Sequence, residues 1–157
     1  SDNTVEIQLP IIRHFFPEAK VLGMRASPSD IAIRLGAVIA GVSARLGRNT
    51  AVIGSTDLTH YGRNYGFSPR GEGPDAVRWV KEDNDRKIVD AFLAMDAEYA
   101  ISLAGRNHSA CSAGGAAAAV SFARESGASR GSLMEYMTSW DIHPSDSFVG
   151  YAGITFE

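Results

Sequence analysis

Apolar residues recur at helical spacing in the stretch of chain that follows Pro28. Asp30 is a candidate N-cap at the start of this stretch, and Gly47 is a candidate stop at its end. Between them the apolar residues lie three or four positions apart: Ile31, Leu35, Val38, Ile39, Val42 and Leu46. Residues at this spacing share one face of a helix. The pattern therefore predicts an amphipathic helix from Asp30 to about Leu46.

Three further helices are expected after Pro74. The first is long and amphipathic, with a core stripe made of Val77, Val80, Ile88, Phe92 and Leu93. A shorter helix is predicted after Asp96, running to Leu103. The last runs from Cys111 to Gly127 and reads CSAGGAAAAVSFARESG, so its first half carries almost no side-chain volume. Another backbone can approach such a helix closely.

Short apolar runs predict strands before, between and after these helices. The run TAVIGS, Thr50 to Ser55, is continuous enough for a strand buried on both faces, as in a parallel sheet. The run LGMRASP, residues 22–28, predicts a short strand that ends at Pro28. Two strands are predicted to close the chain, at Leu133–Trp140 and Phe148–Phe156. Strands interleaved with helices predict an α/β layer fold, and the two nearly consecutive last strands predict a mixed sheet.

The chain is interpreted as a single domain over residues 1–157, because no internal repeat or low-complexity linker divides it. A chain of this size buries roughly 70% of the surface that it exposes when unfolded. Hydrophobic residues make up 45% of the sequence and charged residues 21%, as in an ordinary globular domain.

Charge and composition argue against several kinds of partner. The net charge is −3 and no basic run exceeds two residues, so the clustered cationic surface that nucleic acids require is absent from the sequence. No apolar run has transmembrane length, and no targeting segment is recognisable. The single cysteine leaves no internal disulfide to form. We therefore expect no nucleic-acid or membrane partner and a cytoplasmic location.

The segment GSTDLTHYG, Gly54–Gly62, is the first candidate for chemistry. Asp57 and His60 would follow the predicted buried strand, at the sheet edge where open α/β folds bind their ligands. Histidine titrates near neutrality and can take and return a proton. An aspartate three residues away is able to orient that histidine or hold it protonated. The alternative is a turn capped by Asp57, with His60 as a surface histidine.

Cys111 is the second candidate, because the predicted helix places it at an N-terminus. The positive end of the helix dipole favours a thiolate, which is both a nucleophile and a soft metal ligand. The alternative is a structural role, since an unpaired cysteine is often buried as a small hydrophobic residue.

The remaining histidines and motifs give weaker signals. The four histidines, at 14, 60, 108 and 143, show no HxH or HExxH spacing, so no complete metal site is readable in the chain. His108 lies shortly before Cys111 and is an additional candidate, whereas His14 and His143 are expected on the surface. Residues 71–76 fit a dinucleotide-binding fingerprint, but they follow Ser-Pro-Arg rather than a strand.

The predicted loop from Gly62 to Pro74 carries two arginines and two aromatic residues: Arg63, Tyr65, Phe67 and Arg70. Such side chains suit a segment that covers a pocket and binds an anion. An ordinary solvated loop is the alternative.

Four segments in order resemble the Memo family, whose microbial members are often called protein B of the AmmeMemoRadiSam system. NTVEIQLPII, from Asn3, is similar to the family's HSxExQLPFL element, and GSTDLTHYG to its SSDxxHxG element. HSACSAGGAAAAVSFARESGA is similar to the family's TxCGxGPIxxxLxAAxxLGA helix. The closing strands LMEYMTSWDI and SFVGYAGITF are similar to its LLxYxTSxD and VGYAxxxF elements. Together these segments cover nearly the whole chain.

The resemblance implies the three-layer mixed-sheet α/β fold of the Memo proteins and class III extradiol dioxygenases, with only the C-terminal half present. Those dioxygenases use non-haem Fe(II) and a histidine acid/base, which corresponds here to His60 with Asp57. Memo proteins bind their metal through two histidines of the N-terminal half and a cysteine that matches Cys111. The resemblance thus implies a divalent transition metal, Fe(II) foremost, and a dioxygenase-like oxidoreductase. A non-catalytic adaptor that binds a small molecule, a peptide or a metal in the same pocket is the alternative.

The sequence also departs from the family pattern. The N-terminal half, with its two ligand histidines, has no counterpart here, and Asn3 stands where the family has the histidine of its HSxExQLPFL element. A metal held by Cys111 alone would bind weakly. We therefore expect a second chain to supply the N-terminal half, or a missing N-terminal segment to do so.

Overall fold

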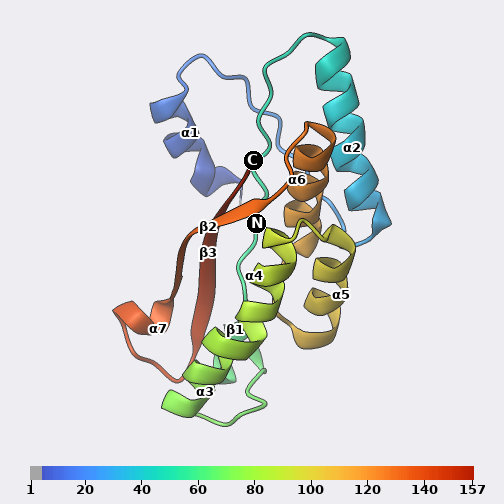
Figure 1. Ribbon diagram of the computed structural model, residues 1–157. Helices are drawn as coiled ribbons and strands as arrows, with labels where there is room; N and C mark the ends of the chain where they lie inside the picture. The colour runs from blue at the N-terminus through green and yellow to red at the C-terminus, as the bar shows by residue number, and fades with distance from the viewer. Residues whose placement is uncertain (1–4) are drawn as a thin grey trace.

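The computed structural model describes residues 5–157, and its ordered core is built from helices packed beside a small sheet (Figure 1). A 3-10 turn, η1 (Glu6–Gln8), leads into the short helix α1 (Leu9–Phe15), and α2 (Asp30–Arg45) follows after an extended stretch. The segment GSTDLTHYG then crosses the molecule and ends in the two-residue strand β1 (His60–Tyr61).

The remaining elements alternate helices and strands. A second 3-10 turn, η2 (Arg63–Tyr65), lies in the loop after β1. Next come α3 (Pro74–Trp79), the π-helical turn η3 (Val80–Asn84), α4 (Asp85–Leu93), α5 (Ala97–Asn107) and α6 (Ala113–Glu125). The chain closes with β2 (Gly131–Thr138), the short helix α7 (Ser139–Ile142) and β3 (Phe148–Phe156).

The three strands of the described residues form one sheet in the order β1-β3-β2, and every neighbouring pair is antiparallel. β3 pairs with β2 along its length, from Gly150 opposite Thr138 to Phe156 opposite Gly131. On its other side β3 meets β1 only at its start, where Val149 lies opposite His60. The rest of that edge of β3 has no strand beside it among the described residues.

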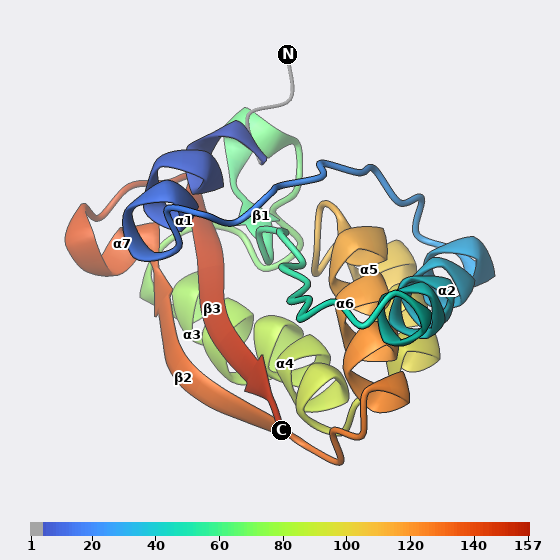
Figure 2. The ribbon, with the colours of Figure 1, turned by 90° about the horizontal axis from the view of Figure 1, so that it is seen from above.

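The helices α4, α5, α6 and α2 lie in a row on one side of the sheet, whereas α1 and α7 lie apart from this row (Figure 2). α4 packs against β2 and β3, α5 and α6 follow it, and α2 is outermost, against α6. The main apolar core lies between the sheet, α4, α5 and α6, and includes Ile88, Phe92, Leu103 and Val120. A second, aromatic cluster surrounds the fully buried Tyr61 near β1. No helix of the described residues combines the length and the apolar composition that crossing a bilayer requires.

The helix predictions were correct in kind, and their limits moved by a few residues. The helix predicted after Pro74 is α3, η3 and α4 in one continuous run, interrupted by the π turn. The predicted stripe residues Val77, Val80, Ile88 and Phe92 are buried, and Leu93 is half-buried. α5 ends at Asn107 rather than Leu103, and α6 begins at Ala113 rather than Cys111.

The helix α2 forms where it was predicted, but it buries a different face. Its N-cap position is Ser29, and its buried residues are the small ones, Ala32, Gly36 and Ala40. A Cβ on Gly36 would lie 2.2 Å from the carbonyl oxygen of Ala118 in α6, so the two backbones touch. The predicted apolar stripe is divided: Leu35, Ile39 and Val42 are half-buried, whereas Ile31, Val38 and Leu46 are 64%, 61% and 66% exposed.

The two closing strands were predicted correctly, but the two earlier ones were not. Residues 22–28 and Thr50–Ser55 form no strand in the described structure, and the predicted burial of Thr50–Ser55 is also wrong, with Ile53 exposed. A strand requires a neighbouring strand for its backbone hydrogen bonds, and neither segment has one among the described residues. Among the described residues the sheet is not mixed, since both strand pairs that form are antiparallel. The α/β class is confirmed in its coarse sense, a mixture of helices with a sheet.

Candidate metal-binding site

The segment before β1 is attached to the rest of the fold through its backbone. Leu58 N–H donates to Gly150 O at 2.9 Å, and Gly150 N–H donates to Thr59 O at 3.0 Å, so this part of the segment lies along the start of β3. From the other side, Cys111 N–H donates to Asp57 O at 3.1 Å. These bonds bring together the two candidate segments, which are about fifty residues apart in the sequence.

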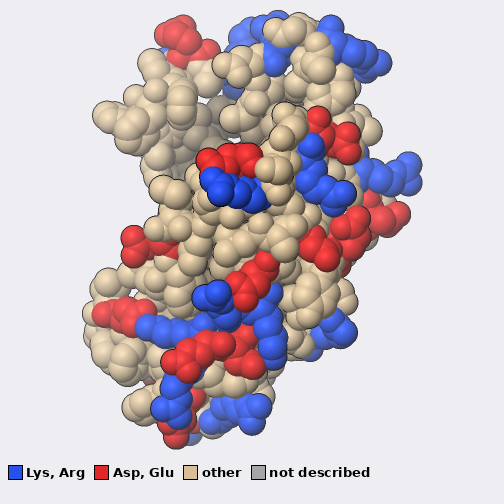
Figure 3. Space-filling view, in the orientation of Figure 1, with Lys and Arg blue, Asp and Glu red and all other residues tan. Residues whose placement is uncertain are grey.

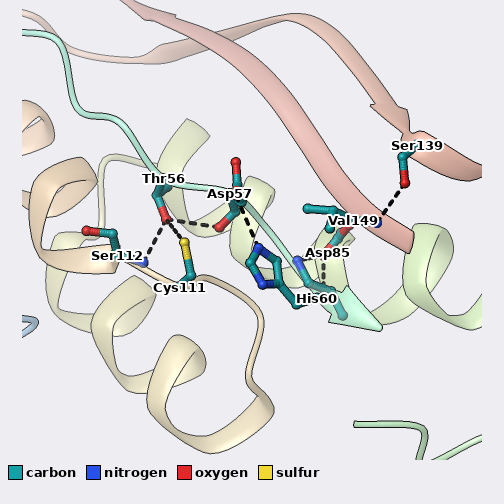
Figure 4. A network of polar contacts seen from close by, with 9 residues as sticks. Thr56, Asp57, His60, Asp85, Cys111, Ser112, Ser139 and Val149 are labelled. Carbon is teal, nitrogen blue, oxygen red and sulfur yellow. Dashed lines mark hydrogen bonds and ion pairs between the residues drawn. The ribbon is translucent and has the colours of Figure 1, made fainter. Parts of the chain in front are cut away.

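Asp57, His60 and Cys111 converge at this point (Figure 4). One ligand atom from each side chain lies within 4.8 Å of the other two. His60 Nε2 and Asp57 Oδ2 are 3.1 Å apart and form a hydrogen bond. Cys111 Sγ lies 3.8 Å from the hydroxyl of Thr56, which also accepts a hydrogen bond from Ser112 N–H at 3.0 Å. Cys111 is therefore not in the first turn of α6 but just before its N-cap position, Ser112.

The cluster is open to solvent on one side. The side chains of Asp57 and His60 are 43% and 33% exposed, and Cys111 is exposed. The interpretation of Cys111 as a buried hydrophobic residue is therefore wrong. A ligand or an ion can reach all three side chains without a change in the fold.

Two tyrosines lie around the cluster. The ring of Tyr65, in η2, lies 4.8 Å from the ring of His60. The pKa of Tyr151, on β3, is raised by its partial burial and, to a smaller extent, by the nearby groups of Asp57 and Tyr65. Both rings are still partly exposed, so the rim of the site presents aromatic surface and phenol hydroxyls.

A buried polar network holds the segment Gly54–Gly62 in place. Asp85, the first residue of α4, is fully buried and accepts hydrogen bonds from Thr59 N–H at 3.0 Å and from the hydroxyls of Thr59 and Tyr136. Asn84 Nδ2 donates to the Thr59 hydroxyl at 2.9 Å and to the carbonyl oxygen of Asn107. Burial raises the pKa of the Asp85 carboxyl, and its hydrogen bonds oppose that rise. Burial, followed by the charge of Asp85, raises the pKa of Tyr136.

Sequence reasoning missed this network, although a signal was present. Asn84 and Asp85 precede Ile88 by four and three residues, so both lie on the apolar face of the helix. Polar side chains on a buried face require partners inside the protein. They indicate a buried network even when the partners themselves are unknown.

The other sequence candidates lie apart from the cluster. His108 ends α5 in the left-handed conformation, with φ 51°, and its ring is 5.0 Å from Phe67. His14 lies beside Phe15 in α1. In the loop after β1, Arg63 forms an ion pair with Glu72, and Arg70 lies over the ring of Trp79. The two loop arginines thus have partners near the loop, as the interpretation of a solvated loop expects.

The three donors of the cluster suit a divalent transition metal. Thiolate, imidazole and carboxylate are the ligands that zinc and iron use in proteins, and catalytic sites often have three of them. In a tetrahedral site with bonds of about 2.1–2.3 Å, two ligand atoms lie about 3.6 Å apart. The cluster is wider than that, since its atoms lie within 4.8 Å of one another, so the side chains would have to move together by about 1 Å to share an ion.

Comparison with known proteins gives the same family that the motifs indicated. The sequence profile of the Memo-like proteins matches residues 1–155. The chain is 32% identical over 161 aligned residues to the MEMO1 family protein PH1626 of Pyrococcus horikoshii, covering 98% of this chain and 55% of that protein. It is 31% identical to the MEMO1 family protein TK1477 of Thermococcus kodakarensis, covering 99% of this chain and 56% of that protein.

A helical layer beside a sheet, with a cysteine, a histidine and an aspartate gathered at the start of the last strand, defines an α/β protein with a candidate metal site. The match over nearly the whole chain makes the assignment specific: this chain belongs to the Memo-like family. It spans about half the length of the curated relatives that it matches.

Proposed function

We propose that this chain carries one part of the active site of a Memo-like, metal-dependent oxidoreductase. In this proposal Cys111 is a ligand of a divalent transition metal, Fe(II) foremost, and His60 with Asp57 forms an acid/base pair beside it. The observation that carries the proposal is the convergence of these three side chains within 4.8 Å, in an exposed place. A second polypeptide, or a further part of the same one, completes the fold and supplies the remaining metal ligands.

The geometry gives His60 and Asp57 separate tasks. His60 Nε2–H donates to the Asp57 carboxylate, so that carboxylate fixes the orientation of the ring. Nδ1 is then left to take a proton from a substrate hydroxyl and to return it. The buried Asp85 holds the backbone of Thr59, between these two residues, and so fixes the distance between them. Bound Fe(II) would supply the Lewis acidity and one-electron chemistry of non-haem iron enzymes.

The aromatic rim supports a small, planar substrate. Tyr65 and Tyr151 offer ring surface for stacking and hydroxyls for hydrogen bonds to the oxygen atoms of a diol. An aromatic diol with adjacent hydroxyls fits both this rim and the acid/base pair. The exposed, single thiol of Cys111 suits a reducing compartment, and we propose the cytoplasm.

Metal binding is tested first, with Co(II) as a spectroscopic probe under anaerobic conditions. A thiolate ligand gives an absorption band from sulfur-to-cobalt charge transfer, so in the completed assembly the band should form with the unmodified chain and disappear in Cys111→Ala. Ser112→Ala, at the adjacent position, is the matched control and should keep the band. A band of equal strength in Cys111→Ala would refute the assignment of this ligand.

Activity is tested by oxygen uptake with a panel of aromatic diols, using the Fe(II)-loaded protein in its completed assembly. His60→Gln should retain the metal and lose at least about 100-fold in rate, as expected when a general acid/base is removed. If His60→Gln instead loses the metal, His60 is a ligand and not a proton carrier. If oxygen uptake is absent for the whole panel although metal is bound, the second candidate function is favoured.

That second candidate is a non-catalytic protein that binds a small molecule, a peptide or a redox metal in the same place. The observation that favours it is the exposure of the cluster and of its two tyrosines, which suits a ligand that stays bound at the surface. In that case Tyr65→Ala should weaken ligand binding, while no turnover is measured with any variant.

A further inference from the structure

A cavity of about 690 Å³ lies between the segment Ala51–Thr56 and β3. Its walls are largely apolar: Ile53 and Leu58 on one side, Ala152 and Ile154 of β3 on the other, and Ala119 and Phe122 of α6 behind. Figure 2 shows the segment and β3 on either side of this space, with α6 beside the segment. The cavity has room for further side chains, and none of the described residues fills it.

The backbone of β3 is unpaired where it borders the cavity. Gly150 directs both its N–H and its C=O toward Leu58 and Thr59. Because these groups alternate in direction along a strand, those of Ala152 and Ile154 face the same way, while Tyr151 and Gly153 bond to β2. No described residue bonds to the backbone of Ala152 or Ile154 on that side.

The opposite wall is a second unpaired backbone. The segment Ala51–Gly54 is apolar, and no backbone hydrogen bond joins it to another of the described residues. It is nevertheless held in place, since a Cβ on Gly54 would lie 2.7 Å from the carbonyl oxygen of Gly115 in α6. The wall is therefore fixed by its contact with α6 before anything fills the cavity.

The two walls run in opposite directions. The segment leads into β1, and β1 pairs with β3 antiparallel; Figure 1 shows the segment descending toward β1 while β3 rises from it. A strand placed between them would be parallel to one and antiparallel to the other. Its apolar side chains would pack on Phe92 and on the small residues of α6.

We propose that this cavity is the acceptor site for a β-strand of the polypeptide that completes the Memo-like fold. The proposal rests on the proposed function, which requires such a polypeptide. The relatives contain sequence that could supply this strand, since a little under half of each relative lies outside its match to this chain. An unpaired edge on each side gives the strand its hydrogen bonds, and the apolar walls exclude charged segments.

The further apolar surface of the chain supports a large partner rather than a lone peptide. Around α1 the exposed side chains include Ile7, Ile11, Phe15 and Phe16. Figure 3 shows charged residues over the end of the molecule that holds α3 and α4 and also over α2, whereas the surface around α1 is mostly uncharged. A monomer rarely exposes so much apolar surface, and a partner that reaches into the cavity would also cover part of it.

The test uses a chimera in which the part of PH1626 outside the match is joined to Ser1 through a flexible Gly/Ser linker. Linkage raises the effective concentration to the millimolar range, so modest complementarity suffices. Amide hydrogen exchange is followed residue by residue in the chimera and in the chain alone. In the chain alone, Ala152 and Ile154 should exchange fast and Tyr151 and Gly153 slowly. In the chimera, Ala152 and Ile154 should slow by about 100-fold or more.

Two variants and two controls test the place of insertion. Ile53→Lys puts a charge on the cavity wall at a residue that is 61% exposed, so the chain itself should still fold. Ile142→Lys makes the same change on α7, at a residue that is 74% exposed and far from the cavity. Ala152→Pro removes an N–H that faces the cavity, and Ala152→Ser keeps it. Ile53→Lys should abolish the slowing at Ala152 and Ile154, and Ala152→Pro should abolish it at Ile154, whereas the two controls should leave it intact.

The outcomes separate this inference from the proposed function. If the two parts associate but Ala152 and Ile154 still exchange fast, the strand acceptor is refuted while completion by a partner stands. If the two parts do not associate even when linked, the strand acceptor and the completion of the fold by a partner are both refuted. Cobalt binding through Cys111 is measured separately in the same samples, so its presence or absence reports on the metal site alone.

Discussion

Asp85→Ala should lower the free energy of unfolding by about 3 kcal/mol. The change removes the acceptor of three hydrogen bonds, from Thr59 N–H, the Thr59 hydroxyl and the Tyr136 hydroxyl. Thr59 is fully buried, so water cannot replace the acceptor for its two donors, and each unsatisfied buried donor costs about 1–3 kcal/mol. Relief from burying a carboxylate offsets part of that sum, and the Tyr136 hydroxyl is near enough to the surface to find water.

The conservative variant Asp85→Asn separates the effect of the hydrogen bonds on stability from the effect of the charge. Its amide oxygen can still accept both bonds from Thr59, and its NH₂ group can donate to the oxygen of Tyr136. We expect Asp85→Asn to lose less than about 1 kcal/mol at neutral pH, because both buried donors of Thr59 keep their acceptor and only the Tyr136 O–H loses one. Urea unfolding with linear extrapolation measures both variants, provided that the slope of the transition does not change.

The pH dependence gives a second, independent readout. Burial raises the pKa of Asp85 above its unfolded value, so the folded state holds this proton more tightly than the unfolded state does. The contribution of Asp85 to stability is therefore complete below the unfolded pKa and declines as pH rises through the folded pKa. The stability of the unmodified protein minus that of Asp85→Asn should fall over the pH range above 3.8, the ordinary pKa of this carboxyl. A difference that rises over this window, or an Asp85→Ala loss below about 1 kcal/mol, would contradict the reasoning.

Three other perturbations follow from the described contacts. Gly36→Ala should destabilise the protein by about 2 kcal/mol in urea unfolding, because its Cβ would lie 2.2 Å from Ala118 O. Gly41→Ala, on the same helix with nothing within 4 Å of its Cβ, should instead stabilise by about 0.5–1 kcal/mol, and equal effects would refute the close contact of α2 with α6. The pKa of Asp141 is lowered by its hydrogen bond from Lys81, so its contribution is present above the unfolded pKa and lost as pH falls through the folded value. Asp141→Asn should therefore cost about 1 kcal/mol at pH 7 and nothing near pH 2, as measured by thermal unfolding. In oxygen uptake by the completed protein, Asp57→Asn should slow turnover less than His60→Gln does, since Asp57 only orients the ring through its hydrogen bond; the reverse order would exchange the two roles.

Local patterns predicted the helices and the two closing strands because their partners are near in sequence. β2 and β3 are separated only by α7 and a short turn, so each has its partner close at hand. Thr50–Ser55 has the composition of a strand, but a strand also depends on a neighbour that this pattern cannot specify. For α2, the spacing correctly indicated a helix, whereas the choice of buried face depended on α6 offering only small side chains.

The candidate site could also be predicted from the sequence only where its contacts are local. Asp57 and His60 lie three residues apart, so their hydrogen bond follows from local geometry. The approach of Cys111 depends on a long-range backbone bond to Asp57, and the sequence indicated it only through the family resemblance. The role of Asp85 depends on Thr59 and Tyr136, which come from two other elements. Such convergence from three elements cannot be deduced from the spacing of residues in one of them.

The π turn η3 gives the helix from Pro74 to Leu93 an extra residue without turning one half of it against the other. A π turn contains one residue more than an α-helical turn, and here it occupies Val80–Asn84, directly before Asp85. Because the extra residue is taken up within that turn, deleting one exposed residue of it, such as Glu82, would restore a regular helix. Val77 and Val80 would still face the aromatic cluster while Ile88 and Phe92 face the main core. A deletion inside α4 would instead rotate everything beyond it by about 100°. Deletions should therefore be tolerated within the π turn but eliminated by selection within α4.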